Sequence, residues 1–203
     1  MRCIITLALL VAGANAQMVR QCLCSEVQGC KSAALNSIQP CADRCQNHVS
    51  AMGGSIPAVR QCIMQQEGRI RAGAACIERH FGNSCAARPG LTVPRRDPHT
   101  AQFAAMREIT QMIARSGLTS QAIPFLAAGK RLAGCVQQCA QAHSCSRLGC
   151  GLSLPSDSIL VSTAKQCAMQ AGFSTAVARQ VCNCLMNAGI RQLAPICPRI
   201  VIT

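Results

Sequence analysis

The side chains that most often perform catalysis are scarce in this sequence and do not combine into a recognisable site. Only four histidines and seven carboxylates occur in 203 residues. The histidines are His48, His80, His99 and His143. No GxSxG, HExxH or calcium-loop pattern is present, and Glu78 and His80, two residues apart, would point in different directions from a helix. We therefore expect a protein that is not an enzyme, with no catalytic residues and no cofactor.

Arginine is the chemically versatile side chain that the sequence has in excess. Lys and Arg number 20 against 7 Asp and Glu, and 17 of the 20 are Arg. The planar guanidinium fork suits sulfate, carboxylate and phosphate, although net charge also serves solubility. The candidate polyanion-binding residues are Arg60, Arg69, Arg71, Arg79, Arg95 and Arg96. Chondroitin sulfate or another acidic polysaccharide is the expected partner. Nucleic acid is not expected, because Trp and Tyr are absent and only four Phe are available to stack on bases.

The N-terminus has the features of a secretory leader. Arg2 precedes an apolar run from Cys3 to Ala12, and Ala14 and Ala16 have the small-x-small spacing that signal peptidase accepts. We expect residues 1–16 to be removed, which leaves a net charge of +12 from 19 basic and 7 acidic residues. An uncleaved N-terminal anchor is the alternative. No later segment has the roughly 18 consecutive apolar residues of a transmembrane helix, so we predict a secreted, extracellular protein.

Cysteine is the second abundant reactive residue. Removal of Cys3 with the leader turns 17 cysteines into 16, and an even number in a secreted chain predicts complete pairing. Structural zinc is disfavoured, because Cys22–Cys24 and Cys182–Cys184 enclose one residue rather than the usual two to four or so. The disulfide candidates are Cys22, Cys24, Cys30, Cys41, Cys45, Cys62, Cys76, Cys85, Cys135, Cys139, Cys145, Cys150, Cys167, Cys182, Cys184 and Cys197.

These cysteines fall into two groups of eight, in residues 17–85 and 101–203. The sequence RQCIMQQ at 60–66 is echoed by KQCAMQA at 165–171, and Cys45–Cys62 and Cys150–Cys167 have the same spacing. The pattern indicates an internal repeat, although the ends of the two groups do not align. The equal counts would let each half close its own disulfides.

The segment between the groups, 86–100, is rich in proline and predicts a linker or exposed loop. Its Arg95-Arg96 pair has two interpretations. It is either a processing site that would release two disulfide-closed halves, or part of a plain solvated loop.

The remaining segments favour helices. Asp97-Pro98 is typical of a helix start, and Ser116-Gly117 of its end. Alanine-rich stretches at 25–38, 68–82, 156–172 and 174–189 also predict helices, several of them with Ser or Thr at the start and Gly at the end. Cysteines four residues apart, as at Cys41 and Cys45, would share one helical face aimed at a neighbouring helix.

We therefore predict a mostly α, disulfide-stapled helical protein of two related helical halves. With so few aromatic residues, the core must come from aliphatic side chains. Each half is near the size at which burial alone is marginal, so cross-links of about 2–4 kcal/mol each would offset the deficit.

The cysteines and the residues around them follow the pattern CLCSEVQGC…CADRCQNHVSAMGGSIPAVRQC…CVQQC…LGCGLSLPSDSILVSTAKQC…VCNCLMNAGI. This pattern resembles that of secreted, cysteine-rich nematode proteins with the domain named for chondroitin proteoglycan four. The resemblance covers most of the chain after the leader and implies a non-enzymatic extracellular role of matrix or eggshell type. It supplies no catalytic residues. The single Ser-Gly pair, Ser116-Gly117, follows Arg115 rather than an acidic residue, so the chain is a poor candidate to carry chondroitin, though its charge would suit binding it.

A carrier of lipid or of another small hydrophobic ligand is the alternative function. Alanine-rich helices, Cys-x-Cys and the CGLSLP sequence are similar to helical, disulfide-rich lipid-transfer proteins of plants, although the adjacent Cys-Cys pair of that family is missing. An apolar tunnel among the helices could hold an acyl chain, with arginines at its mouth. Such a tunnel would be lined by the same Leu, Ile, Val and Met residues that fill an ordinary core.

Overall fold

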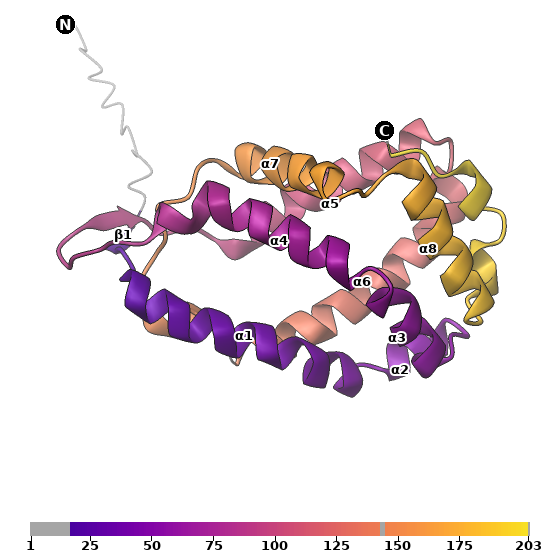
Figure 1. Ribbon diagram of the computed structural model, residues 1–203, viewed down its shortest axis with the longest axis horizontal. Helices are drawn as coiled ribbons and strands as arrows, with labels where there is room; N and C mark the ends of the chain where they lie inside the picture. Colours follow the sequence, from indigo (N-terminus) through magenta and orange to yellow (C-terminus); the bar gives the residue numbers. More distant parts are fainter. Residues whose placement is uncertain (1–16, 143–144, 203) are drawn as a thin grey trace, which may run out of the picture.

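The computed structural model describes residues 17–142 and 145–202, and their secondary structure is mostly helical (Figure 1). The α-helices are α1 (Cys24–Arg44), α2 (Asn47–Ala51), α3 (Ile56–Met64), α4 (Glu67–Phe81), α5 (Pro98–Arg115), α6 (Thr119–Gln141), α7 (Asp157–Gln170) and α8 (Thr175–Asn187). Short 3₁₀ helices are η1 (Gly82–Ser84), η2 (Cys145–Leu148), η3 (Arg191–Leu193) and η4 (Cys197–Arg199). The predicted leader, residues 1–16, and His143 lie outside the described residues.

Local signals in the sequence correctly mark several helix boundaries. Asp97 caps α5, because its carboxylate accepts a hydrogen bond from the His99 N–H at 2.9 Å. Ser174 caps α8 in the same way, through a 3.4 Å bond from the Val177 N–H. Gly117 and Gly172 follow α5 and α7 with φ of +65° and +88°, values that favour glycine. The helices predicted at 97–117, 156–172 and 174–189 are therefore confirmed.

Two helices contain a proline. α1 continues past the predicted alanine-rich stretch 25–38 to Arg44 and contains Pro40, and α6, whose start and end were not predicted, contains Pro124. Proline removes a backbone donor and normally ends or kinks a helix. In α1, the turn after Pro40 carries Cys41 and Cys45, and both are cross-linked to α6. Disulfides to another helix thus stabilise turns that the local sequence alone would not keep helical.

The Pro-rich segment is not simply a linker. Within it, β2 (Thr92–Pro94) pairs antiparallel with β1 (Met18–Arg20), and Val19 lies opposite Val93. Val93 is buried, and the Arg95 N–H donates to the Gln17 carbonyl at 2.7 Å. Within the predicted linker or exposed loop over 86–100, residues 92–94 are therefore fixed by a short antiparallel pairing with β1, and Val93 is not exposed.

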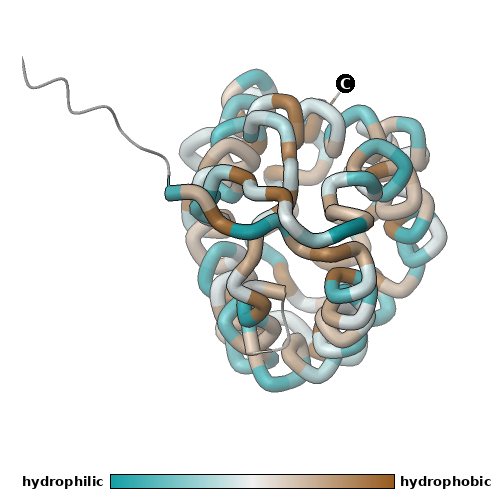
Figure 2. The backbone as a smooth tube through the Cα atoms, turned by 90° about the vertical axis from the view of Figure 1, so that its left-hand side faces the viewer, coloured by the Kyte–Doolittle hydropathy of each residue, from teal (hydrophilic) through white to brown (hydrophobic). Residues whose placement is uncertain are grey.

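The helices pair across the two halves. α1 packs on α6, α3 on α8, and α4 on α7, while α5 contacts both α6 and α7. Figure 1 shows α1 along the lower edge, α4 and α7 along the upper edge, and α6 crossing behind them. Viewed from the β1 end, the helices surround the interior, with hydrophobic residues spread along them (Figure 2). Each main pair joins a helix of the first cysteine group to one of the second.

The disulfides, like the helix pairs, mostly connect the first cysteine group to the second. Six of the eight join the two groups, and the other two are Cys24–Cys85 and Cys182–Cys197. The six are Cys22–Cys150, Cys30–Cys145, Cys41–Cys139, Cys45–Cys135, Cys62–Cys184 and Cys76–Cys167. The halves therefore do not close their own bonds, contrary to one possibility that the equal counts left open.

The pairs of cysteines four residues apart behave as predicted. Cys41 and Cys45 of α1 bond to Cys139 and Cys135 of α6, with the order reversed. Each pair therefore points at a neighbouring helix rather than at itself, and the reversed order makes α1 and α6 antiparallel.

Cystine contributes much of the buried interior. The largest fully buried side chains are those of Leu118, Cys41, Cys45, Cys167 and Cys197. Leu118 and Cys197 also belong to an apolar cluster, whose other buried members are Cys182, Ile190, Leu193 and Ile196. Disulfides thus fill space as well as restrict the unfolded chain.

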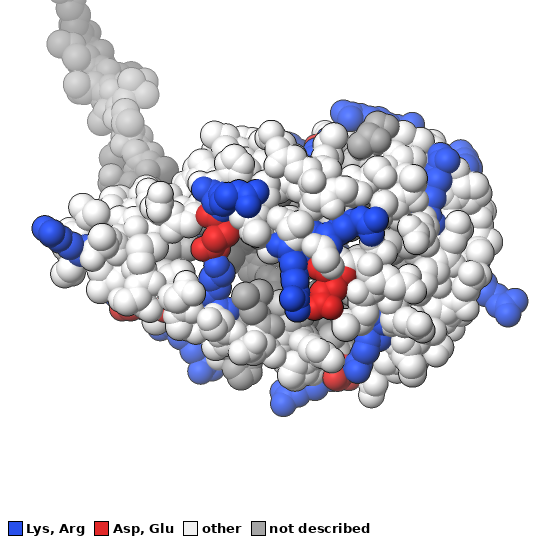
Figure 3. Space-filling model, viewed as in Figure 1, with Lys and Arg blue, Asp and Glu red and all other residues white. Residues whose placement is uncertain are grey.

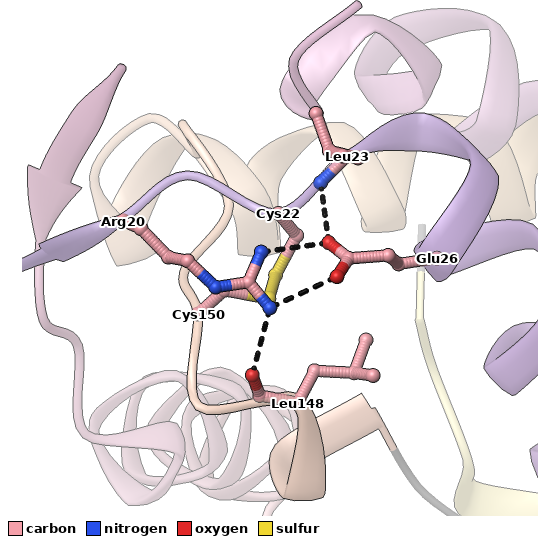
Figure 4. A network of polar contacts seen from close by, with 6 residues as sticks. All are labelled: Arg20, Cys22, Leu23, Glu26, Leu148 and Cys150. Atoms are coloured by element: carbon pink, nitrogen blue, oxygen red, sulfur yellow. Dashed lines mark hydrogen bonds and ion pairs between the residues drawn. A yellow bond between two sulfur atoms is a disulfide. The ribbon is translucent and has the colours of Figure 1, made fainter. Parts of the chain in front are cut away.

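One corner of the molecule is held by a polar network next to the Cys22–Cys150 bond (Figure 4). Arg20 donates two hydrogen bonds to the Glu26 carboxylate, at 2.8 and 2.9 Å, and a third to the Leu148 carbonyl at 3.0 Å. The Leu23 N–H also donates to Glu26, at 2.9 Å. These bonds from Arg20 and Leu23 hold the pKa of Glu26 below its ordinary value. The network ties β1, the start of α1 and η2 together.

Candidate ligand-binding cleft

An apolar cleft of about 390 Å³ lies between α5, α6, α8 and the C-terminal segment. It is lined by Ile109, Met112, Ile113, Ser116, Leu118, Ala122, Phe125, Leu126, Phe173, Ala178, Val181, Cys182, Leu185, Leu193, Ile196, Ile200, Val201 and Ile202. Ser116 is the only hydroxyl-bearing side chain among them, and Cys182 is in a disulfide. The lining is therefore almost entirely hydrocarbon.

Three amphipathic helices form the walls. α8 contributes Ala178, Val181, Cys182 and Leu185, which recur at three- and four-residue intervals. α5 supplies Ile109, Met112 and Ile113 with the same spacing, and Ser116 follows as its C-cap. α6 adds Ala122, Phe125 and Leu126. Residues at these intervals lie on one face of a helix, so each helix presents a continuous apolar stripe to the cleft.

The floor is rigid and the rim is open. Leu118, Leu193 and Ile196 are buried, whereas Ile109 and Val201 are 38% and 45% exposed. The Cys182–Cys197 disulfide joins α8 to η4 beneath the cleft. A surface of this kind cannot easily collapse on itself, because its base is cross-linked.

The last described residues, 199–202, form a strap along one wall. The Arg199 guanidinium donates to the Gly117 carbonyl at 2.8 Å, and the Val201 N–H to the Ser116 hydroxyl oxygen at 3.1 Å. The Ile202 N–H donates to the Thr175 hydroxyl oxygen at 3.1 Å. Arg179 of α8 donates through Nε to the Ile200 carbonyl at 3.0 Å. Hydrogen bonds to α8 and to Ser116 and Gly117, just after α5, thus place three apolar strap residues, 200–202, against the cleft.

The arginines predicted to bind polyanions lie on three segments of the structure, and three of the six form ion pairs. Arg69, Arg71 and Arg79 lie on α4, Arg60 on α3, and Arg95 and Arg96 after β2. Arg60 pairs with Asp43, Arg71 with Glu67 and Arg96 with Asp157. Figure 3 shows basic side chains scattered over one face, several of them beside acidic ones. Arg60, Arg71 and Arg96 are therefore each engaged by an acidic side chain of the protein itself.

The other three of these arginines differ in their surroundings. Arg69 donates to the Gln66 side chain at 2.8 Å and Arg95 to that of Gln17 at 3.3 Å. Arg79 is exposed on α4. Arg69 and Arg79, ten residues apart on one helix, are separated along its axis by about 15 Å.

A group of possible metal ligands is explained by a disulfide. Within the described ranges, Cys76, His80 and Cys167 are the one such cluster, with ligand atoms within 4.8 Å of one another. Cys76 and Cys167 are bonded to each other, so neither sulfur is a thiolate that could bind a metal. His48, His80 and His99 lie on three different helices, α2, α4 and α5.

The sequence predicts the helix that carries Ile109, Met112 and Ile113 but not the cleft that these residues line. The same spacing recurs at Ala122–Leu126 and Ala178–Leu185, and that signal was available. What the sequence could not supply is which stripes face one another.

No protein-family model, no curated protein and no solved structure matches this chain. None of the helices in residues 17–142 and 145–202 is long and apolar enough to cross a membrane. Its functional assignment therefore depends on its own residues and geometry.

Proposed function

We propose that the protein is a secreted, non-enzymatic carrier of a small hydrophobic ligand, which binds in the cleft between α5, α6 and α8. The observation that carries this proposal is the apolar lining of the cleft, in which the Ser116 hydroxyl is the one polar side-chain group. Its volume of about 390 Å³ falls at the lower end of the range of about 300–1,000 Å³ that is typical of ligand pockets.

A hydrophobic ligand would gain considerable binding free energy by leaving water for this cleft. Burial of apolar surface is favourable by about 25 cal/mol per Å², and a pre-formed site avoids the cost of ordering its walls. The Cys182–Cys197 bond and the cross-links Cys41–Cys139 and Cys45–Cys135 fix helices that make the walls. Eight disulfides also fit an oxidising, extracellular setting.

Binding of Nile red, an uncharged dye whose fluorescence rises in apolar surroundings, tests the proposal. Ala178→Phe fills the cleft and should weaken dye binding about tenfold or more, while the far-ultraviolet circular dichroism stays unchanged. Ala176→Phe is the matched control, because Ala176 lies two residues away on α8, is exposed and does not line the cleft. Equal dye binding by both variants would refute the proposal.

The charge favours a second proposal: an extracellular matrix or eggshell role in which the protein binds chondroitin sulfate. The sequence resemblance and the net charge of +12 without the leader support it. Among the candidate residues, exposed Arg79 should matter most, because Arg60 is paired with Asp43. Affinity for chondroitin sulfate should fall steeply with added salt and fall more for Arg79→Gln than for Arg60→Gln. Absence of binding at low salt would end this proposal.

A further inference from the structure

The basic and acidic residues are distributed unevenly around the cleft. The segments that build it, 109–126 and 173–202, contain no Asp or Glu. They contain four arginines, which are Arg115, Arg179, Arg191 and Arg199. The apolar cleft is therefore made entirely from chain segments that carry positive charge only.

The protein's own carboxylates are already engaged elsewhere. Six of the seven form ion pairs with basic residues outside these segments, and Asp97 caps α5. The six are Glu26, Asp43, Glu67, Glu78, Glu108 and Asp157. None of these ion pairs involves Arg179 or Arg199, so neither arginine is neutralised by an Asp or Glu side chain.

Arg179 and Arg199 also lie at one edge of the cleft. Arg179 Nε donates to the carbonyl of Ile200, whose residue lines the cleft, and Arg199 immediately precedes Ile200. Arg199 Nη2 donates to the Gly117 carbonyl, next to the cleft's only hydroxyl, on Ser116. Each guanidinium has five N–H donors, and these bonds occupy one of them. Backbone carbonyls thus hold two cations at the apolar rim, and most N–H donors of each guanidinium are not used in these bonds.

We propose that the cleft binds a single-chain anionic amphiphile, with its hydrocarbon chain along α5, α6 and α8 and its anionic head group at Arg179 and Arg199. This inference rests on the proposed carrier function and adds the class of ligand. Charge complementarity favours this occupant, because no Asp or Glu side chain in the described part of the chain forms an ion pair with either arginine. A carboxylate and a phosphate offer the same oxygen acceptors to a guanidinium fork.

Calorimetric titration with decanoate, methyl decanoate and decyl phosphate separates these possibilities. Decanoate should bind the unmodified protein at least about tenfold more tightly than its methyl ester, because charge-assisted hydrogen bonds are the stronger ones. The ratio of decyl phosphate to decanoate affinity then assigns the head group as phosphate or carboxylate.

Variants locate the head group. The pair Arg179→Gln and Arg199→Gln should lower decanoate affinity about tenfold for each replaced arginine and leave methyl decanoate affinity unchanged. Arg191→Gln is the matched control, because it removes the same charge from a residue that lines a different hollow, together with Asn187, Gly189 and Ala194. Equal loss of decanoate binding in this control would overturn the assignment of the head-group residues.

The titrations also separate failure of this inference from failure of the carrier function. If methyl decanoate binds as tightly as decanoate to the unmodified protein, the anionic ligand class is wrong and the carrier function stands. If neither compound binds and Nile red does not bind, both are wrong. Should replacement of Arg199 disturb the strap, the comparison of acid and ester on the unmodified protein still decides the ligand class.

Discussion

At the residue scale, two glycines show how tightly the halves fit. Gly53, between α2 and α3, and Gly189, after α8, have φ of +82° and +109°, and the Ser55 N–H donates to the Ala188 carbonyl at 2.7 Å. A Cβ atom at Gly189 would overlap the Gly53 carbonyl oxygen. Two loops from opposite halves therefore meet backbone to backbone, where no side chain fits.

Gly189→Ala should lower the free energy of unfolding by about 2 kcal/mol or more, through backbone strain and this overlap. Gly29→Ala is the matched control, because Gly29 lies within α1 with open space around its Cα. That change should be neutral or stabilise the protein by up to about 1 kcal/mol. Chemical denaturation of both variants measures the difference, and similar values would contradict the close approach.

Glu26 should make stability depend on pH. Its pKa is lowered in the folded protein, chiefly by the hydrogen bonds from Arg20, so its ionised form stabilises the fold above the ordinary carboxylate pKa of about 4.3. This contribution is lost as the pH falls through the lowered, folded-state pKa. Thermal unfolding between about pH 7 and pH 3 should therefore show a weaker acid dependence for Glu26→Gln. An acid dependence of Glu26→Gln equal to that of the unmodified protein would contradict this contribution.

At the scale of elements, the sequence predicts helices where their ends carry local signals. Asp97, Ser174, Gly117 and Gly172 act within a few residues, so α5, α7 and α8 could be placed. α6 and the end of α1 depend on bonds to each other across about a hundred residues, which no local rule contains. The cleft could not be predicted for the same reason. Its apolar stripes are visible in the sequence, but which stripes face each other depends on disulfide connectivity. The eight cysteines of one half alone allow 105 pairings.

The strap depends on the Cys182–Cys197 bond, which closes a loop with a sequence separation of 15. Replacing both cysteines by Ala should lower the free energy of unfolding by about 3 kcal/mol and weaken Nile red binding, because η4 would no longer be fixed to α8. Replacing Cys24 and Cys85 is the control, since that bond joins the start of α1 to residue 85, outside the cleft. It should reduce stability without reducing dye affinity, and an equal loss of affinity would contradict this role.

At the scale of the whole molecule, the disulfides show a regular exchange. The exchange appears when Cys41, Cys45, Cys62 and Cys76 are matched with Cys135, Cys139, Cys167 and Cys184. Swapping the matched residues turns Cys41–Cys139 into Cys45–Cys135 and Cys62–Cys184 into Cys76–Cys167. This matching differs from the equal Cys45–Cys62 and Cys150–Cys167 spacings, which would match Cys45 with Cys150. The helix pairs α3·α8 and α4·α7 exchange in the same way. The internal repeat stays a prediction, and this relation is what two interleaved copies would produce.

Cleavage after Arg95 or Arg96 should not separate the halves. Six disulfides cross the cleavage point, and Arg96 is held by Asp157 and the Pro155 carbonyl. Protein cut at this site by a dibasic-specific protease should run as one band without reductant and as two with it. Two bands without reductant would contradict the cross-half pairing.

The crossed disulfides also constrain how a cell makes the protein. During synthesis the N-terminal half emerges first, yet only Cys24 and Cys85 find their partners within it. The other six cysteines of that half bond to partners between Cys135 and Cys184. Those thiols must stay reduced, or be reshuffled, until most of the chain has been synthesised. We therefore expect disulfide isomerase activity to raise the yield of native protein.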